Sequence, residues 1–290
     1  MKRYRIVSTQ KQTAQVLDVR ENIELTCFFP RKLKPICGDF VSLENKIDEW
    51  VINEIHPSHN VFARANHKGQ KQQIAANVDN QIIVVAVEPE PTRDLINRYL
   101  VAAHNCEMQP IIIFNKNDIN EHFFDEEQRI YQDLGYKTFS TNTKNQNQFD
   151  GLLEIMKDKT SIFVGMSGVG KSSISEIILG QELKTGGISK KTGKGSHVTS
   201  VTQLFKIDKI DGYLIDSPGV WEYGLWKMEA QEIAHGFPEI EKESHQCKFS
   251  NCTHTHEPKC AVKTAVENNQ IHQKRYQSYL RIIDSMKYWE

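Results

Sequence analysis

The chain has 290 residues, with 36 Lys and Arg against 37 Asp and Glu, and 39% of its residues are hydrophobic. This composition is typical of a soluble folded protein and too apolar for a disordered one. The longest aliphatic runs, 82–87 and 111–114, are far shorter than the roughly 20 apolar residues of a membrane-spanning helix. No apolar segment of a secretory signal follows the basic N-terminus, so we expect no membrane partner. The length predicts about two domains.

The near-neutral total conceals an uneven distribution of charge. Residues 1–72 carry a net charge of +4, residues 73–240 a net charge of −7, and residues 241–290 a net charge of +2. Basic ends on either side of an acidic middle are compatible with nucleic-acid contact, although ordinary solvated surfaces would give the same totals.

The first 72 residues predict a small β-barrel. Short segments alternate apolar and polar residues with period two, and turn residues separate them. An OB-fold suits five such strands, with an SH3-like barrel as the competing interpretation. The predicted strands are 5–7, 14–19, 23–28, 40–43 and 50–55.

From about residue 80 strands alternate with helices, which predicts an α/β domain with a parallel sheet. The strands read as continuous β-branched runs, as buried parallel strands do. We expect strands at 81–87, 110–114, 137–139, 161–164 and 213–215, and helices at 92–106, 125–134, 151–156 and 171–179. The lysine- and glycine-rich segment 184–199 predicts a loop, and the tail ends in a helical stretch.

A glycine-rich motif of the form G-x-x-x-x-G-K-[ST] lies between the predicted strand 161–164 and the predicted helix 171–179. In such a loop, backbone N–H groups and the helix N-terminus surround phosphate oxygens. Lys171 would reach the β- and γ-phosphates, and the Ser172 hydroxyl would bind Mg²⁺. The predicted phosphate-binding residues are Gly165, Met166, Ser167, Gly168, Val169, Gly170, Lys171, Ser172 and Ser173.

A second motif, N-K-x-D, follows the predicted strand 110–114 and consists of Asn115, Lys116, Asn117 and Asp118. Ligands bind at the carboxyl ends of parallel strands. A carboxylate there can accept hydrogen bonds from the guanine N1–H and 2-amino groups, a donor pair that adenine lacks. The sequence therefore predicts a preference for GTP over ATP.

The third motif, D-x-x-G, follows the predicted strand 213–215. Asp216 would hold Mg²⁺ through water and the Gly219 N–H would face the γ-phosphate. Between this motif and the P-loop, Thr199 is the predicted metal-sensing hydroxyl, with Ser200 and Thr202 as rivals. In Ras-like GTPases N-K-x-D follows the P-loop, whereas here it precedes it, so the nucleotide domain is predicted to be circularly permuted.

Three cysteines and one histidine lie within 14 residues near the C-terminus: Cys247, Cys252, His254 and Cys260. Three thiolates and one imidazole form a closed tetrahedral shell, the arrangement of structural Zn²⁺. His245 and His256 are alternatives to His254. The other cysteines are scattered and there is no signal peptide, which favours a reducing compartment.

Together these motifs closely resemble the RsgA (YjeQ/YloQ) family of bacterial circularly permuted GTPases. The resemblance implies an OB-fold at residues 1–72, a permuted P-loop GTPase domain at 73–225 and a mainly α zinc domain at 226–290. It also implies a cytoplasmic, monomeric GTPase that binds the small (30S) ribosomal subunit and its 16S rRNA late in maturation. Binding would stimulate hydrolysis of GTP to GDP and phosphate. Ser140 best matches the guanine-supporting segment of the family, although extra polar residues follow it before Gly151.

Catalysis needs a group that orients the attacking water. The position after D-x-x-G, where Ras-like enzymes have Gln, is Val220 here. We expect slow intrinsic turnover, and hypothesise that His197 orients the water when RNA orders its segment; an ordinary solvated histidine is the alternative. An RNA-binding assembly module with little hydrolysis is the second functional interpretation, and a P-loop small-molecule kinase the third.

The predicted barrel also offers candidates for RNA contact, because OB-folds bind nucleic acid through basic grooves and stacking aromatic side chains. For each residue an ordinary surface or core role is an open alternative. The candidates are Arg3, Arg5, Lys32, Lys34, Arg64 and Lys68, with Phe28, Phe29 and Trp50 near them.

Overall fold

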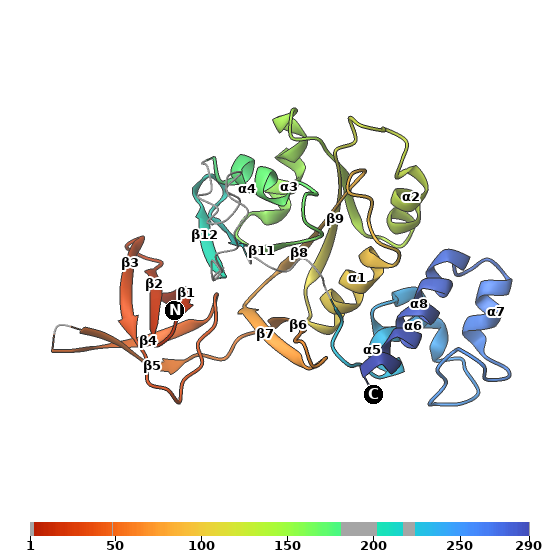
Figure 1. Ribbon diagram of the computed structural model, residues 1–290, viewed down its shortest axis with the longest axis horizontal. Helices are drawn as coiled ribbons and strands as arrows, with labels where there is room; N and C mark the ends of the chain where they lie inside the picture. The colour runs from red at the N-terminus through yellow and green to blue at the C-terminus, as the bar shows by residue number, and fades with distance from the viewer. Residues whose placement is uncertain (1–2, 48, 181–201, 217–223, 290) are drawn as a thin grey trace, which may run out of the picture.

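The computed structural model describes residues 3–47, 49–180, 202–216 and 224–289. Figure 1 shows three parts in a row: a barrel, a central α/β domain and a group of helices at the C-terminal end. The barrel and the C-terminal helices lie on opposite sides of the central domain, so each contacts it through its own junction.

Four antiparallel pairings and one parallel pairing close the N-terminal barrel in the strand order β1-β2-β3-β5-β4. The only parallel pair among them joins β3 to β5, and β1 closes the barrel on β4. This order is that of an OB-fold, which confirms the predicted class over an SH3-like barrel. The strands are β1 (Tyr4–Gln10), β2 (Thr13–Asp18), β3 (Ile23–Phe28), β4 (Phe40–Lys46) and β5 (Glu49–Ile55).

A hairpin that the sequence did not predict follows the barrel. Strands β6 (Val61–Ala65) and β7 (Lys71–Ala76) pair as a two-stranded sheet of their own. The backbone N–H of Ala65 donates to the carbonyl of Gly224, so the hairpin also contacts the chain that leaves the central domain.

The central sheet has the order β10-β9-β8-β11-β13-β12, and its first five strands are parallel. The edge strand β12 pairs antiparallel with β13, a strand missed because its short apolar alternation follows a polar segment. The strands are β8 (Asn80–Ala86), β9 (Gln109–Asn115), β10 (Lys137–Ser140), β11 (Thr160–Val164), β12 (Gln203–Ile207) and β13 (Gly212–Asp216).

Helices cover both faces of this sheet, which explains the continuous apolar runs. Along β8, Ile83 and Val85 face one core with α1, whereas Ile82 and Val84 face a second core with α3 and α4. The helices are α1 (Leu95–Asn105), α2 (Asp125–Asp133), α3 (Asp150–Met156) and α4 (Lys171–Leu179), with the 3₁₀ turns η1 (Gln146–Phe149) and η2 (Asp208–Ile210).

Four helices form the C-terminal part and pack on α1 from the side opposite the sheet (Figure 1). They are α5 (Ala230–His235), α6 (Pro238–Ser244), α7 (Ala261–Glu267) and α8 (Gln273–Met286), followed by the turn η3 (Lys287–Trp289). Among the helices of the described ranges, none combines the length and apolar character of a membrane span.

Candidate nucleotide-binding site and metal centre

The P-loop leaves the carboxyl end of β11 and enters α4, the strand–loop–helix context that its sequence requires. Three glycines with positive φ shape it: Gly165 at 145°, Gly168 at 77° and Gly170 at 100°. A Cβ at Gly165 would lie 2.2 Å from the carbonyl oxygen of Val84, so only glycine fits there. Ser172 and Ser173 are exposed in the first turn of α4.

Lys171 lies at the centre of this loop. Its ammonium donates to the carbonyl oxygens of Gly165 at 2.7 Å and of Met166 at 2.6 Å. Burial lowers the pKa of Lys171 to about 8, against the opposing attraction of Asp216. Burial likewise raises the pKa of Asp216 at the end of β13, and the positive charge of Lys171 opposes that rise. The two groups are thus near enough to interact electrostatically.

The N-K-x-D segment begins at the last residue of β9 and contacts the P-loop directly. The Asn115 amide donates to the Val169 carbonyl at 2.8 Å and is buried. A Cβ on Gly170 would lie 2.3 Å from that amide nitrogen. Lys116 donates to the Glu88 carbonyl at 2.5 Å, from the segment after β8. The edge formed by the carboxyl ends of the strands therefore brings together the P-loop, the N-K-x-D motif and Asp216. Asp216 is the one residue of D-x-x-G within the described ranges.

The segment after β10 supports N-K-x-D through Thr141. Its buried hydroxyl donates to Asn115 Oδ1 at 3.1 Å, and its carbonyl accepts from the Asn117 N–H at 3.2 Å. The hydroxyl of Ser140, the residue predicted from the sequence, donates instead to the Gln128 side chain at 2.7 Å.

Asp118 is held by a residue that the sequence analysis did not single out. Lys144 Nζ lies 2.6 Å from Asp118 Oδ2, and this hydrogen bond lowers the pKa of the carboxyl group. Spacing along the chain could not identify this pair, because it depends on the fold of the polar loop 141–148.

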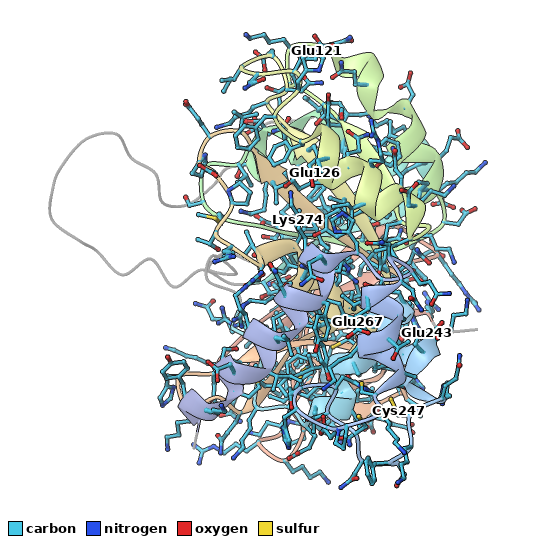
Figure 2. All side chains as sticks on the ribbon, turned by 90° about the vertical axis from the view of Figure 1, so that its right-hand side faces the viewer. Glu121, Glu126, Glu243, Cys247, Glu267 and Lys274 are labelled. Carbon is cyan, nitrogen blue, oxygen red and sulfur yellow. The ribbon has the colours of Figure 1, made fainter. Side chains whose placement is uncertain are left out.

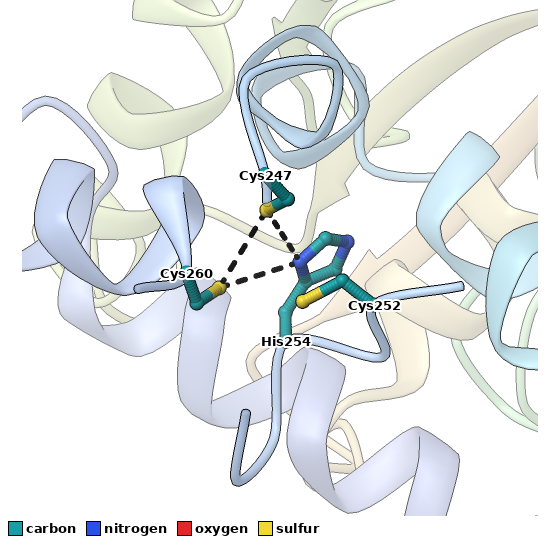
Figure 3. A group of neighbouring side chains, drawn as sticks. All are labelled: Cys247, Cys252, His254 and Cys260. Atoms are coloured by element: carbon teal, nitrogen blue, oxygen red, sulfur yellow. Dashed lines mark hydrogen bonds between the residues drawn. The ribbon is translucent and has the colours of Figure 1, made fainter. Parts of the chain in front are cut away.

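The predicted metal ligands meet in the C-terminal part. The ligand atoms of Cys247, Cys252, His254 and Cys260 all lie within 4.8 Å of one another, and Figure 3 shows them converging from separate turns. His254 Nδ1 is 3.6 Å from Cys247 Sγ and 3.5 Å from Cys260 Sγ, and these two sulfurs are 3.9 Å apart.

These separations fit tetrahedral zinc. Zn–S bonds near 2.3 Å and Zn–N bonds near 2.0 Å place ligand atoms about 3.5–3.8 Å apart. Tyrosines of α8 hold the ligand loop: Tyr276 donates to the His254 carbonyl at 2.7 Å, and Tyr279 to the Thr253 carbonyl at 2.9 Å. The predicted cluster can therefore hold a metal ion, with His254 rather than its neighbours as the histidine of the group.

A groove of about 900 Å³ crosses the barrel surface between the β1–β2 turn and β5. Phe28 is exposed beside it, and the lysines that line it are Lys11, Lys32 and Lys46. Arg5, a predicted RNA contact, is buried at 3% exposure and cannot reach a surface ligand. That prediction was wrong because the guanidinium bonds interior carbonyl groups instead.

Three predicted catalytic residues, His197, Thr199 and Gly219, lie outside the described residues, and so does Val220. Their assigned roles stay predictions from the sequence.

Comparison with known proteins identifies the family. The sequence model described as RsgA GTPase matches residues 55–226. The chain belongs to this family. It is therefore a GTP hydrolase with a circularly permuted nucleotide domain, as the resemblance implied.

Relatives in the RsgA GTPase family match most of the chain. The small ribosomal subunit biogenesis GTPase RsgA of Saccharophagus degradans is 38% identical over 261 residues, which are 87% of this chain and 76% of the relative. That of Hahella chejuensis is 40% identical over 258 residues, 87% of this chain and 74% of the relative.

Solved structures of the family agree with the fold. YjeQ from Thermotoga maritima superposes with a TM-score of 0.79 at 30% identity, covering 98% of each chain. YloQ, described as a circularly permuted GTPase, superposes with a TM-score of 0.78 at 27% identity, covering 99% of this chain and 95% of its own.

Proposed function

We propose that this GTPase binds the small ribosomal subunit and assists its late maturation, hydrolysing GTP to GDP and phosphate with turnover that the subunit stimulates. The observation that carries the proposal is the contact between Asn115 and the P-loop at Val169, which joins base and phosphate motifs at one sheet edge. The names of the relatives, small ribosomal subunit biogenesis GTPases, supply the partner.

The P-loop would bind the phosphates. Its backbone N–H groups would surround the β-phosphate, and Lys171 would exchange its two carbonyl partners for phosphate oxygens. Bound Mg²⁺ would neutralise charge on the β- and γ-phosphates, and the oxygen donors of Ser172, Thr199 and Asp216 suit that ion. The Gly219 N–H would face the γ-phosphate.

The N-K-x-D motif would select the base. Both oxygens of Asp118 would accept from guanine, while Lys116 would lie along the ring and Asn117 would hold the loop through its backbone. We assign Ser140 and its neighbour Thr141 to the support of this loop.

The metal of the C-terminal cluster is proposed to be one structural Zn²⁺. Three thiolates and one imidazole leave no ligand position open, so the ion would stabilise the fold rather than take part in chemistry.

The barrel groove is the proposed contact for 16S rRNA. Its lysines would bind phosphates and Phe28 would stack on an unpaired base, the combination by which OB-folds bind single strands. Affinity should then fall steeply with salt.

The proposed division is an OB-fold at 1–72, a GTPase domain at 73–225 and a zinc domain at 226–290. The family match that ends at residue 226 supports the second boundary, whereas the first boundary falls within β7 and the core of the barrel ends at Ile55. None of the six cysteines, all of which lie in the described ranges, is in a disulfide, which supports a cytoplasmic location. Light scattering would test the proposed monomer.

GTP hydrolysis measured under single-turnover conditions, with and without purified 30S subunits, tests the proposed function. We expect slow hydrolysis alone and a large acceleration with the subunit. Unaccelerated hydrolysis despite tight subunit binding would instead support an assembly module that binds GTP with little hydrolysis.

The role of His197 needs its own variant. His197→Ala should lose subunit-stimulated turnover while GTP and subunit binding stay normal, because the residue is proposed to orient water only. Stimulated turnover close to that of the parent protein would remove His197 from the mechanism.

A further inference from the structure

The base site contains an ion pair that blocks the carboxylate assigned to guanine. Lys144 Nζ lies 2.6 Å from Asp118 Oδ2, and the two side chains are 81% and 29% exposed. Guanine needs both oxygens of Asp118 as acceptors, because its N1–H and 2-amino groups donate side by side. An ammonium at Oδ2 occupies the position of one of those donors.

The loop that carries Lys144 is tied to the N-K-x-D motif. The Asn142 amide nitrogen donates to Asn117 Oδ1 at 3.1 Å. The oxygen of the same Asn142 amide accepts the backbone N–H groups of Lys144 at 3.2 Å and Asn145 at 3.1 Å. One side chain therefore joins the loop to the motif and forms the turn that presents the lysine.

A further hydrogen bond joins the two ends of this loop. The Gln148 side chain accepts from the backbone N–H of Asn142 at 2.8 Å. The extra residues before Gly151 thus form a defined loop over the base site, with its cation directed at Asp118.

We infer that Lys144 is an internal competitor of guanine, a residue that sets the affinity for guanine nucleotides by holding Asp118 until the base displaces it. The inference rests on the proposed role of Asp118. Since Lys144 is mostly exposed, its ammonium can move into water when guanine arrives, so it tunes the affinity without preventing binding. An exposed pair of this kind is worth a factor of roughly two to five in an equilibrium constant.

The first test measures binding of fluorescent GDP to Lys144→Ala in the full-length protein. We expect binding two- to five-fold tighter than in the parent protein at low salt, and a smaller gain at high salt, where the pair is screened. Removing a cation would otherwise weaken the binding of an anionic nucleotide, so the sign of the change identifies competition. Lys144→Arg should retain the pair and bind like the parent.

Lys157 provides the matched control. It is exposed and precedes β11, so it lies at the edge of the sheet opposite the P-loop. Lys157→Ala should leave GDP affinity unchanged. Unchanged or weaker GDP binding by Lys144→Ala would overturn the inference.

An Asp118→Asn background separates this inference from the proposed function. An amide at residue 118 can donate to the 2-oxo group of xanthine, so the preference should shift toward xanthosine diphosphate. In that background Lys144→Ala should have no effect on xanthosine diphosphate affinity, because the carboxylate it pairs with is gone. If Asp118→Asn keeps its guanine preference, the assignment of Asp118 fails. If the preference shifts but Lys144→Ala leaves GDP affinity of the parent unchanged, only the competitor role fails.

Discussion

The two junctions of the central domain are built differently. The barrel has a small core of its own, formed by residues such as Ile6, Val16 and Ile52, and joins the core of the central domain through only three of its described buried residues, Val7, Leu17 and Cys37. The C-terminal helices instead share one continuous core with α1 and the sheet, which includes Leu100, Phe237 and others. The barrel therefore packs mostly against itself, whereas the C-terminal helices pack mostly against the central domain.

The barrel junction contains a buried cation, Arg5. Its guanidinium donates to the carbonyls of Gly38 and Asn77 and to the Thr160 hydroxyl at the start of β11. It also lies over the Tyr213 ring of β13, 4.7 Å from the centroid. The barrel is therefore attached to the amino ends of the strands whose carboxyl ends hold the nucleotide motifs.

The C-terminal junction combines apolar packing with a buried polar network. Arg275 pairs with both carboxylate oxygens of Glu239 and donates to Asn97 Oδ1 at 2.5 Å. Tyr131 donates to the same Asn97 oxygen at 2.8 Å. Helices α1, α2, α6 and α8 thus meet at one network.

Two ion pairs nearer the surface lie around this network. Arg281 in α8 donates through Nε and Nη2 to the two carboxylate oxygens of Asp94, the residue before α1. Lys274 of α8 lies beside Glu126 of α2 (Figure 2), and Lys274 Nζ is 2.5 Å from Glu126 Oε2. We infer that the zinc-binding part and the GTPase core form one packed unit, whereas the barrel is joined to that unit by a smaller apolar contact.

Metal removal should give the largest difference in stability between the C-terminal helices and the barrel. Chelation, or Cys252→Ser, is expected to unfold α6 and α7, because structural zinc contributes on the order of 10 kcal/mol in small zinc domains. Through the shared core it should also lower the melting temperature of the central domain. Hydrogen exchange measures both effects, and the barrel amides should keep their protection.

Cys106→Ala is the matched control, since this cysteine is buried but distant in sequence from the ligand group. It should keep one metal ion per chain. Loss of barrel protection on chelation would contradict the separate core.

Next in size is the loss of Arg275. Arg275→Met should cost about 3 kcal/mol, because it leaves the nearly buried carboxylate of Glu239 without its partner. Urea denaturation measures the loss, and Arg275→Met with Glu239→Leu should regain part of it. Arg281→Met should cost less, because Arg281 is itself 34% exposed, so that water can replace it at the Asp94 carboxylate. Equal losses for the two arginines would show that burial does not distinguish them.

Arg5→Met should have a smaller and more local effect, about 1–2 kcal/mol. It removes hydrogen bonds from a charged donor but leaves no buried carboxylate unpaired. Exchange should increase at the Gly38 and Thr160 ends of the junction and stay unchanged in the C-terminal helices. Arg3→Met, which removes the exposed partner of the buried Asp18 carboxylate, serves as the comparison.

The smallest expected effect is a pH dependence at the C-terminal junction. Burial, then the nearby His235 and Arg275, lower the pKa of His104, whose ring also bonds the Tyr136 hydroxyl at 3.0 Å. The unfolded chain therefore takes up the proton first as pH falls through about 6.5. Stability is full above that value and declines below it, despite the opposing attraction of Glu241. The urea midpoint should fall between pH 7 and 5.5, and His104→Gln should reduce the slope.

The sequence was enough to predict those features that depend on residues close together along the chain. Apolar runs gave the strands of the sheet, and motif spacing gave the P-loop, N-K-x-D and the ligand group at Cys247. It missed the β6–β7 hairpin and the edge strand β12, whose short alternations are weak signals. It also misplaced Arg5, because nothing near that residue in the sequence reveals partners such as Asn77 and Thr160. Contacts between distant segments, including Lys144 with Asp118, need the fold itself.

The close approach of Gly170 to Asn115 makes substitutions in the P-loop and in the N-K-x-D motif depend on each other. The space that a methyl group on Gly170 would need is filled by the Asn115 amide, 2.3 Å from where the carbon would stand. Neither position can change alone without disturbing the other, although more than fifty residues separate them along the chain. Moving the chain ends by permutation alters the order of the two motifs but leaves this dependence intact, so selection would act on them as one unit.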